Sequence, residues 1–134
     1  MICFNIPGYC QPKQRTSGKN FSTPKETRAY EKLVKTYASL AMRGKPPLTD
    51  YIALDINIFC EIPESYGKKK TDAAINGILK PIHCDLDNCL KAVLDGMNGV
   101  VYEDDRRIYK IIASRKFTEG EEGVTVMVST APCI

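Results

Sequence analysis

The chain has 134 residues, of which 43% are hydrophobic, and a formal net charge of +3. These values favour one compact domain, spanning residues 1–134, with a single hydrophobic core. No apolar run approaches the roughly 18–20 residues that cross a bilayer, and the N-terminal segment lacks the pattern of a secretory signal, so we expect a cytoplasmic protein without a membrane partner.

The first half of the chain predicts a strand, a helix and a second strand. Residues 2–6 alternate apolar and polar positions, as a short strand does. Thr23 as cap, Pro24 at the first helical position and Glu26 as the end of a capping box predict the start of a helix. Apolar residues at helical spacing continue this helix until Gly44. Residues 52–62 alternate most regularly and predict a strand with one buried face.

The second half predicts two helices and two strands. A short helix over 73–79 follows a basic turn, and a helix over 88–98 carries the apolar stripe of Leu90, Val93, Leu94 and Met97. Residues 108–117 and 124–128 predict a final hairpin. The order β-α-β-α-α-β-β indicates an α+β fold, with a mixed β-sheet on which the helices pack.

Cysteine and histidine content gives little support to several kinds of site. The chain has six cysteines but no CxxC pair, and Cys60 lies in an apolar strand pattern that is typical of a buried, reduced thiol. His83, Cys84 and Cys89 do not have the spacing of common zinc sites. His83 is the only histidine, so a catalytic triad based on histidine has little support.

Charge is unevenly distributed along the chain. The segment 84–105, CDLDNCLKAVLDGMNGVVYEDD, contains six acidic residues and one lysine, whereas residues 11–45 contain nine Lys or Arg and two Glu. Carboxylates alone would repel phosphate. An acidic cluster within a basic protein therefore suggests a divalent metal that acts on a polyanion.

The acidic residues have a spacing that suits a metal site. Asp85 and Asp87 leave an extended chain on the same side, and Asp87, Lys91 and Asp95 share one stripe of the following helix. Asp104–Asp105 follows a short apolar turn that can fold back towards the helix start. Converging in this way, the carboxylates would bind one or two Mg²⁺ ions, which activate water and neutralise phosphate charge. Lys91 lies one turn beyond Asp87 and can contact the scissile phosphate.

Structural roles for the same residues remain open at this point. Asp87 can cap the helix over 88–98 and form an exposed pair with Lys91. Asp104–Asp105 can form a turn before a strand. Asp95 is more typical of a solvated helix residue than of a ligand.

The segment DLDNCLKAVLDGMNGVVYEDDRRI resembles the RusA-like Holliday-junction resolvases, whose signature is D-x-D-N-x-x-K-x-x-x-D-x-x-N-G-x-x-x-x-D-D. The likeness extends over nearly the whole chain and includes PKQR, TPKETRAYE and IPESYGKKK. It implies a RusA-like fold and a homodimeric crossover junction endodeoxyribonuclease that nicks two opposed strands of a four-way junction. It also implies dependence on Mg²⁺, with Mn²⁺ as an alternative, no small-molecule cofactor, and a bacterial or phage origin.

The resemblance assigns roles to individual residues. Asp85, Asp87 and Asp105 correspond to the metal-binding acids, with Asp104 beside them, and Lys91 to the catalytic lysine. Asn88 corresponds to the asparagine after the second acid, which we expect to contact DNA. The sequence departs from the family where His83-Cys84 replaces a frequent Lys-Pro, which affects a local phosphate contact but leaves the carboxylates intact.

Two basic segments flank the acidic one. Each of their residues taken alone is typical of a solvated surface, but together they would neutralise phosphates along the junction arms and make binding dependent on salt. We see no base-reading pattern of aromatic residues, so we expect recognition of DNA shape. The predicted DNA-binding residues are Lys13, Arg15 and Lys19 in the first segment, and Lys68, Lys69 and Lys70 in the second.

Two incisions related by symmetry require two equivalent sites, and a C2 dimer supplies them. The N-terminal strand and the final hairpin are candidate interfaces. Two other functions remain in play: a metal-dependent nuclease for other branched or single-stranded DNA, and a non-catalytic protein that binds junctions and whose acids are structural.

Overall fold

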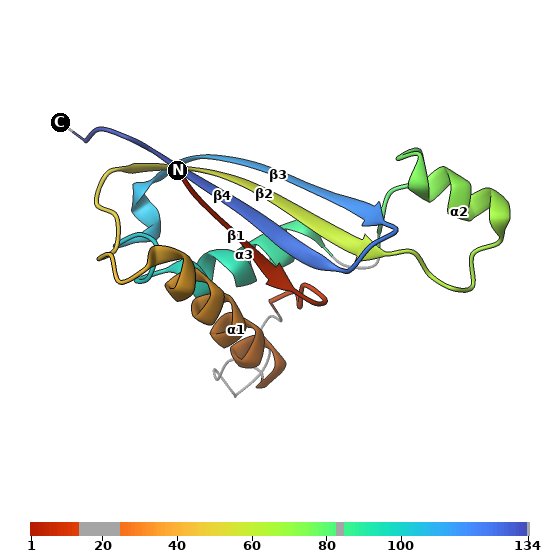
Figure 1. Cartoon of the computed structure of the whole chain (residues 1–134), viewed down its shortest axis with the longest axis horizontal. Helices are drawn as coiled ribbons and strands as arrows, with labels where there is room; N and C mark the ends of the chain where they lie inside the picture. The colour runs from red at the N-terminus through yellow and green to blue at the C-terminus, as the bar shows by residue number, and fades with distance from the viewer. Residues whose placement is uncertain (14–24, 83–84, 134) are drawn as a thin grey trace, which may run out of the picture.

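The computed structural model describes residues 1–13, 25–82 and 85–133, and shows one mixed α+β domain (Figure 1). The order of elements confirms the prediction. It is β1 (Ile2–Pro7), α1 (Lys25–Met42), β2 (Tyr51–Glu61), α2 (Lys68–Ile75), α3 (Leu86–Met97), a 3₁₀ turn η1 (Asp105–Arg107), β3 (Ile108–Thr118) and β4 (Gly123–Ala131). The predicted capping residues of α1, Thr23 and Pro24, lie outside the described residues.

The four strands form one sheet in the order β1-β4-β2-β3. β4 is antiparallel to both of its neighbours, so that Val126 lies between Phe4 and Ile56. β2 and β3 are parallel. A parallel pair needs a long crossover connection, and residues 62–107, which include α2 and α3, provide it.

The predicted final hairpin is wrong. β3 and β4 are consecutive in the chain, but β2 lies between them. Every second residue of β4 from Val124 to Val128 is buried, so one face of this strand lies on the core, and its ladders with β1 and β2 make it a central strand. In β3, Tyr109 and Ile111 are exposed, which suits the edge of the sheet.

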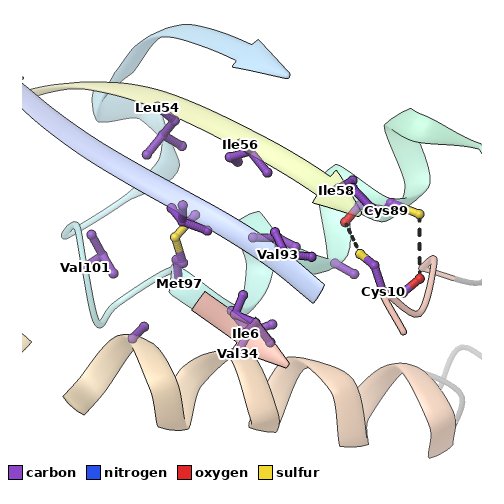
Figure 2. Packing of buried hydrophobic residues seen from close by; sticks show 14 of the residues in the cluster. Ile6, Cys10, Val34, Leu54, Ile56, Ile58, Cys89, Val93, Met97 and Val101 are labelled. Atoms are coloured by element: carbon purple, nitrogen blue, oxygen red, sulfur yellow. Dashed lines mark hydrogen bonds between the residues drawn. The ribbon is translucent and has the colours of Figure 1, made fainter. Parts of the chain in front are cut away.

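The hydrophobic core lies between one face of the sheet and the two helices α1 and α3. Figure 2 shows Leu54, Ile56 and Ile58 of β2 pointing towards Val93 and Met97 of α3. The predicted alternation of β2 is confirmed, because every second side chain from 52 to 60 is buried. α2 stands beyond the end of the sheet (Figure 1). Among the described helices, none is long and apolar enough to span a membrane.

α3 is held in place by a close approach to α1 and by the segment that follows β1. A Cβ atom added to Gly96 would lie 2.6 Å from Val34 Cβ and 3.0 Å from the carbonyl oxygen of Glu31, so only glycine fits between these helices. The thiols of Cys10 and Cys89 each donate to the carbonyl oxygen of the other residue at 3.8 Å (Figure 2). These contacts fix the position of α3 in the fold.

Replacing Gly96 by alanine should therefore destabilise the protein. The new methyl group must displace Val34, and such overpacking costs about 1–3 kcal/mol of unfolding free energy, even though alanine favours helix. Urea denaturation followed by circular dichroism measures this change.

Gly67→Ala is the matched control, because a Cβ at Gly67 meets nothing within 4 Å and the φ of this residue is −73°. We expect this substitution to change stability by less than about 0.5 kcal/mol. Equal effects of the two substitutions would contradict the close approach of α1 and α3.

Candidate active site

The first pair of acids lies at the start of α3. Asp85 occupies the N-cap position but makes no side-chain capping bond. Instead, Asn88 Nδ2 donates to Asp85 Oδ2 at 3.1 Å, and the Asn88 N–H donates to Asp87 Oδ1 at 3.0 Å. Both aspartates are exposed. Asn88 thus orients two carboxylates that face solvent at the positive end of the helix dipole.

The second pair of acids lies at η1. Asp104 Oδ1 accepts the N–H of Arg106 at 2.9 Å, so the expectation of a turn at this point is confirmed. This backbone hydrogen bond lowers the pKa of Asp104, and a hydrogen bond with the side chain of Asp105 lowers it further. The hydrogen bond with Asp104 and the nearby charge of Asp95 raise the pKa of Asp105.

The two pairs lie at different ends of α3. Asp105 and the buried Tyr102 both interact electrostatically with Asp95, and Tyr102 Oη donates to the carbonyl oxygen of Leu94 at 2.7 Å. Asp95 is ten residues beyond Asp85, which corresponds to about 15 Å along a helix axis. Figure 1 shows α3 running from the side of α2 to the opposite side of the molecule, where the segment leading to β3 lies.

The predicted gathering of Asp85, Asp87 and Asp105 within one chain is therefore wrong. Among the side chains that the structure describes, no group of three or more His, Cys, Asp or Glu is close enough to hold a metal ion. The turn before Asp104 does not fold back to the helix start, because Leu48 holds it in place. The Leu48 N–H donates to the Val101 carbonyl at 2.9 Å, and the Glu103 N–H donates to the Leu48 carbonyl at 3.0 Å.

The polar stripe of α3 contains one residue whose role the sequence missed. Asp95 is half-buried and forms an ion pair with Lys13, so it is not simply a solvated helix residue. Lys13 Nζ also lies 3.6 Å from Glu31 Oε1, and its backbone N–H donates to the Asn88 carbonyl at 3.0 Å. The bond with Asp95 is the main cause that raises the pKa of Lys13. Lys91, between Asp87 and Asp95 on the stripe, is exposed.

The predicted DNA-binding residues are only partly within the described structure. Lys68, Lys69 and Lys70 form the exposed first turn of α2. Lys70 Nζ lies 5.4 Å from the ring centroid of Tyr66, which in turn packs edge-on against Phe117. The remaining predicted positions, Arg15 and Lys19, and the departure at His83-Cys84, lie outside the residues that the structure describes.

One chain thus offers two separate carboxylate pairs, in which Asp85, Asp87 and Asp105 are exposed and Asp104 is half-buried, instead of one set of three or four acids. Two carboxylates, together with water and phosphate oxygens, are a usual ligand set for Mg²⁺. A site in which Asp85, Asp87 and Asp105 share a cation does not fit the arrangement within a single chain.

Comparison with known proteins shows a match over almost the whole chain. The family model described as Endodeoxyribonuclease RusA matches residues 5–129, which include both carboxylate pairs. A protein of Bacillus subtilis (strain 168), described as "Uncharacterized protein YqaN", is 29% identical over 138 aligned positions, which cover 96% of each chain.

The ion pair between Lys13 and Asp95 should stabilise the folded protein. In a double-mutant cycle of Lys13→Met and Asp95→Asn, we expect a coupling free energy of about 0.5–1.5 kcal/mol. The pKa of Lys13 is raised in the folded protein above the value of the unfolded chain. The coupling free energy should therefore be fully present at pH values below the pKa of Lys13 in the unfolded chain. It should be lost as the pH rises through the higher pKa of Lys13 in the folded protein.

Urea denaturation between neutral and alkaline pH measures this coupling. The pair of Lys45→Met and Asp50→Asn, two exposed positions outside this cluster, is the control. Strict additivity of Lys13→Met and Asp95→Asn would show that the two side chains do not interact in solution.

Proposed function

Because the chain belongs to the RusA endodeoxyribonuclease family, we propose that it binds four-way DNA junctions as a homodimer and nicks two opposed strands in a reaction that depends on Mg²⁺. Membership of the family implies an endonuclease that resolves Holliday junctions. The observation that carries the proposal is the family match, which includes the two pairs of carboxylates, three of them exposed, on and beside one helix.

The proposed metal ligands are Asp85 and Asp87 at the start of α3, and Asp105 with its neighbour Asp104 at η1. The exposure of Asp85, Asp87 and Asp105 supports this role, because a phosphate must reach any cation that acts on it. When bound, Mg²⁺, or Mn²⁺ in its place, would supply an activated water and positive charge at the phosphate. We expect no further small-molecule cofactor.

Two residues of α3 support the acids in this proposal. Asn88 holds Asp85 at 3.1 Å, so it orients a ligand and is also placed to contact the same phosphate. Lys91 is one helical turn from Asp87, and its exposed ammonium group is proposed to stabilise the charge that develops during cleavage.

Basic residues are proposed to bind the arms of the junction. Lys68, Lys69 and Lys70 lie together on α2, which stands clear of the sheet (Figure 1), so a DNA backbone can approach them. We include Arg15 and Lys19 among the proposed DNA-binding residues because of their positions in the sequence alone. Contact between Lys13 and DNA stays a prediction, since its ammonium group already has two carboxylate partners.

The homodimer follows from the need for two symmetric incisions. Of the two interfaces expected from the sequence, β1 is an edge strand of the sheet and remains a candidate, whereas the final hairpin does not form. Sedimentation at working concentration would reveal a dimer.

A synthetic mobile four-way junction tests the activity. We expect paired nicks with Mg²⁺ and none in a chelator, read on a strand-resolving gel. Asp87→Asn should abolish cleavage and retain junction binding, because the amide is a poorer ligand of nearly the same size. Asp50→Asn, an exposed acid outside both pairs, should cut normally.

Other outcomes of this experiment separate the remaining functions. Normal cutting by Asp87→Asn would mean that the site is misassigned. Preference for flaps, forks or single strands in a substrate panel would favour a different metal-dependent nuclease. Junction binding without incision in any divalent metal would identify a binding protein with structural acids.

Removing the basic cluster of α2 tests the DNA surface. In a chelator, the combined change of Lys68, Lys69 and Lys70 to alanine should weaken junction binding and reduce the salt dependence by about 0.9 in log–log slope for each phosphate that these lysines neutralise. Filter binding or fluorescence anisotropy at several salt concentrations measures both quantities. Lys45→Ala is the control, and an unchanged slope in the triple variant would remove α2 from the DNA surface.

A further inference from the structure

A hollow lies beside η1 at one end of the sheet. The strands β2 and β3 begin at this end, and β4 ends there (Figure 1). The volume of the hollow, about 550 Å³, lies within the range of about 300–1,000 Å³ that small-ligand sites span. The hollow is lined by Tyr51, Glu103, Asp104, Arg106, Arg107 and Cys133.

An irregular register brings a second tyrosine against Tyr51. β3 pairs with β2 residue for residue, except that Tyr109 is skipped between the partners of Ile52 and Ala53. An extra residue of this kind re-aims a side chain. The ring of Tyr109 packs edge-on against the ring of Tyr51, with 6.2 Å between the centroids and 76° between the planes. Tyr51 stays 45% exposed and Tyr109 59% exposed, so the pair holds an aromatic ring at the hollow without burying it.

Two arginines of η1 also line the hollow. Arg107 Nη2 donates to Glu103 Oε2 at 3.4 Å, and Arg107 Nη1 donates to Cys133 Sγ at 3.5 Å. Arg106 Nε lies 3.4 Å from Asp104 Oδ1, and the side chain of Arg106 is 88% exposed. A guanidinium group binds phosphate through two parallel hydrogen bonds. The hollow therefore combines an exposed aromatic ring with two phosphate-binding groups, which suits the base and the phosphate of a nucleotide.

We propose that the hollow binds one unstacked nucleotide of the DNA, with its base against the ring of Tyr51 and its phosphate on Arg106 and Arg107. The inference rests on the proposed function, which makes DNA the ligand. It adds a contact with a base, which the lysines of α2 do not supply. Tyr109 supports the edge of the Tyr51 ring and is a positioning residue. Asp104 lines the same hollow, so the bound nucleotide lies next to the acids of η1.

The chemistry of the hollow selects an unstacked base rather than a duplex. In a duplex, each base is stacked on both faces and offers no face to a protein ring. Where strands exchange, this stacking is interrupted, and less energy is needed to turn a base outwards. Stacking on an aromatic ring tolerates any base, because every base has a π-face. The site therefore contributes to the recognition of DNA shape that the sequence predicts.

Equilibrium binding in a chelator tests the stacking contact. Fluorescence anisotropy with a labelled four-way junction measures the Kd independently of cleavage. We expect Tyr51→Ala and Tyr51→Leu to weaken binding about tenfold, whereas Tyr51→Phe, which keeps the ring, should bind as wild type. Leucine keeps apolar bulk without a π-face, so it separates stacking from general hydrophobic contact. Leu40→Ala, at an exposed position of α1, is the surface control.

An abasic junction provides the matching change in the DNA. Abasic nucleotides, placed in turn at each position around the exchange point, remove the base and keep the phosphate. At the position that the hollow binds, wild type should lose about tenfold in affinity, and Tyr51→Ala should lose nothing further. A tyrosine with a merely structural role would not produce this coupling.

Removing one guanidinium group tests the phosphate contact. Arg106→Gln should reduce the slope of log Kd against log salt concentration by about 0.7–0.9, which corresponds to one phosphate. Because the Arg106 side chain is 88% exposed, the variant should unfold in urea as wild type does. An unchanged slope would contradict the role of Arg106.

Other results separate failure of this inference from failure of the proposed function. Wild-type binding by Tyr51→Ala, or additive effects of Tyr51→Ala and the abasic change at every position, would show that no base stacks on this ring. Displacement of the junction by micromolar deoxynucleoside monophosphate would assign the hollow to free nucleotides and overturn the inference. A wild-type protein that binds junctions but never cuts them would overturn the proposed cleavage alone, and the coupling would still decide the inference.

Discussion

The attachment of α3 to the core is the constraint on which the rest of the site depends. One side of the helix buries Cys89, Val93 and Met97 against the sheet, and Gly96 brings its backbone close to α1. The opposite side carries the polar stripe. Because apolar packing fixes the helix, the acids at its two ends are held at a distance that solvent-exposed side chains cannot change. The distance between the two pairs of carboxylates is thus set by the packing of the core.

The segment after β1 adds an electrostatic link to this packing. Lys13 reaches across α1 and α3 and pairs with Glu31 and Asp95, residues that are 18 and 82 positions away in the chain. The buried Glu31 Oε1 has no hydrogen-bond partner among the described residues, so the charge of Lys13 offsets its burial. The same lysine cancels the charge of Asp95, which faces Asp105. A basic residue that the sequence suggests for DNA also stabilises the acidic helix.

The arrangement of acids connects the fold to the chemistry of the family. Membership of the family implies an endonuclease that resolves Holliday junctions. Asp85 and Asp87 lie at the start of α3, whereas Asp104 and Asp105 lie at η1, so the fold presents the family's acidic residues in two separate pairs.

The sequence by itself determined the order of elements, the α+β class, the buried face of β2, and the identity of the acidic and basic residues. Periodicity and short motifs are local properties of the chain, and they carry this information directly. Tertiary structure alone placed β4 between β1 and β2, because alternation shows which face is buried but not which strand is the neighbour. It also separated Asp105 from Asp85, because backbone hydrogen bonds to Leu48, a residue outside the motif, set the direction of the turn before η1.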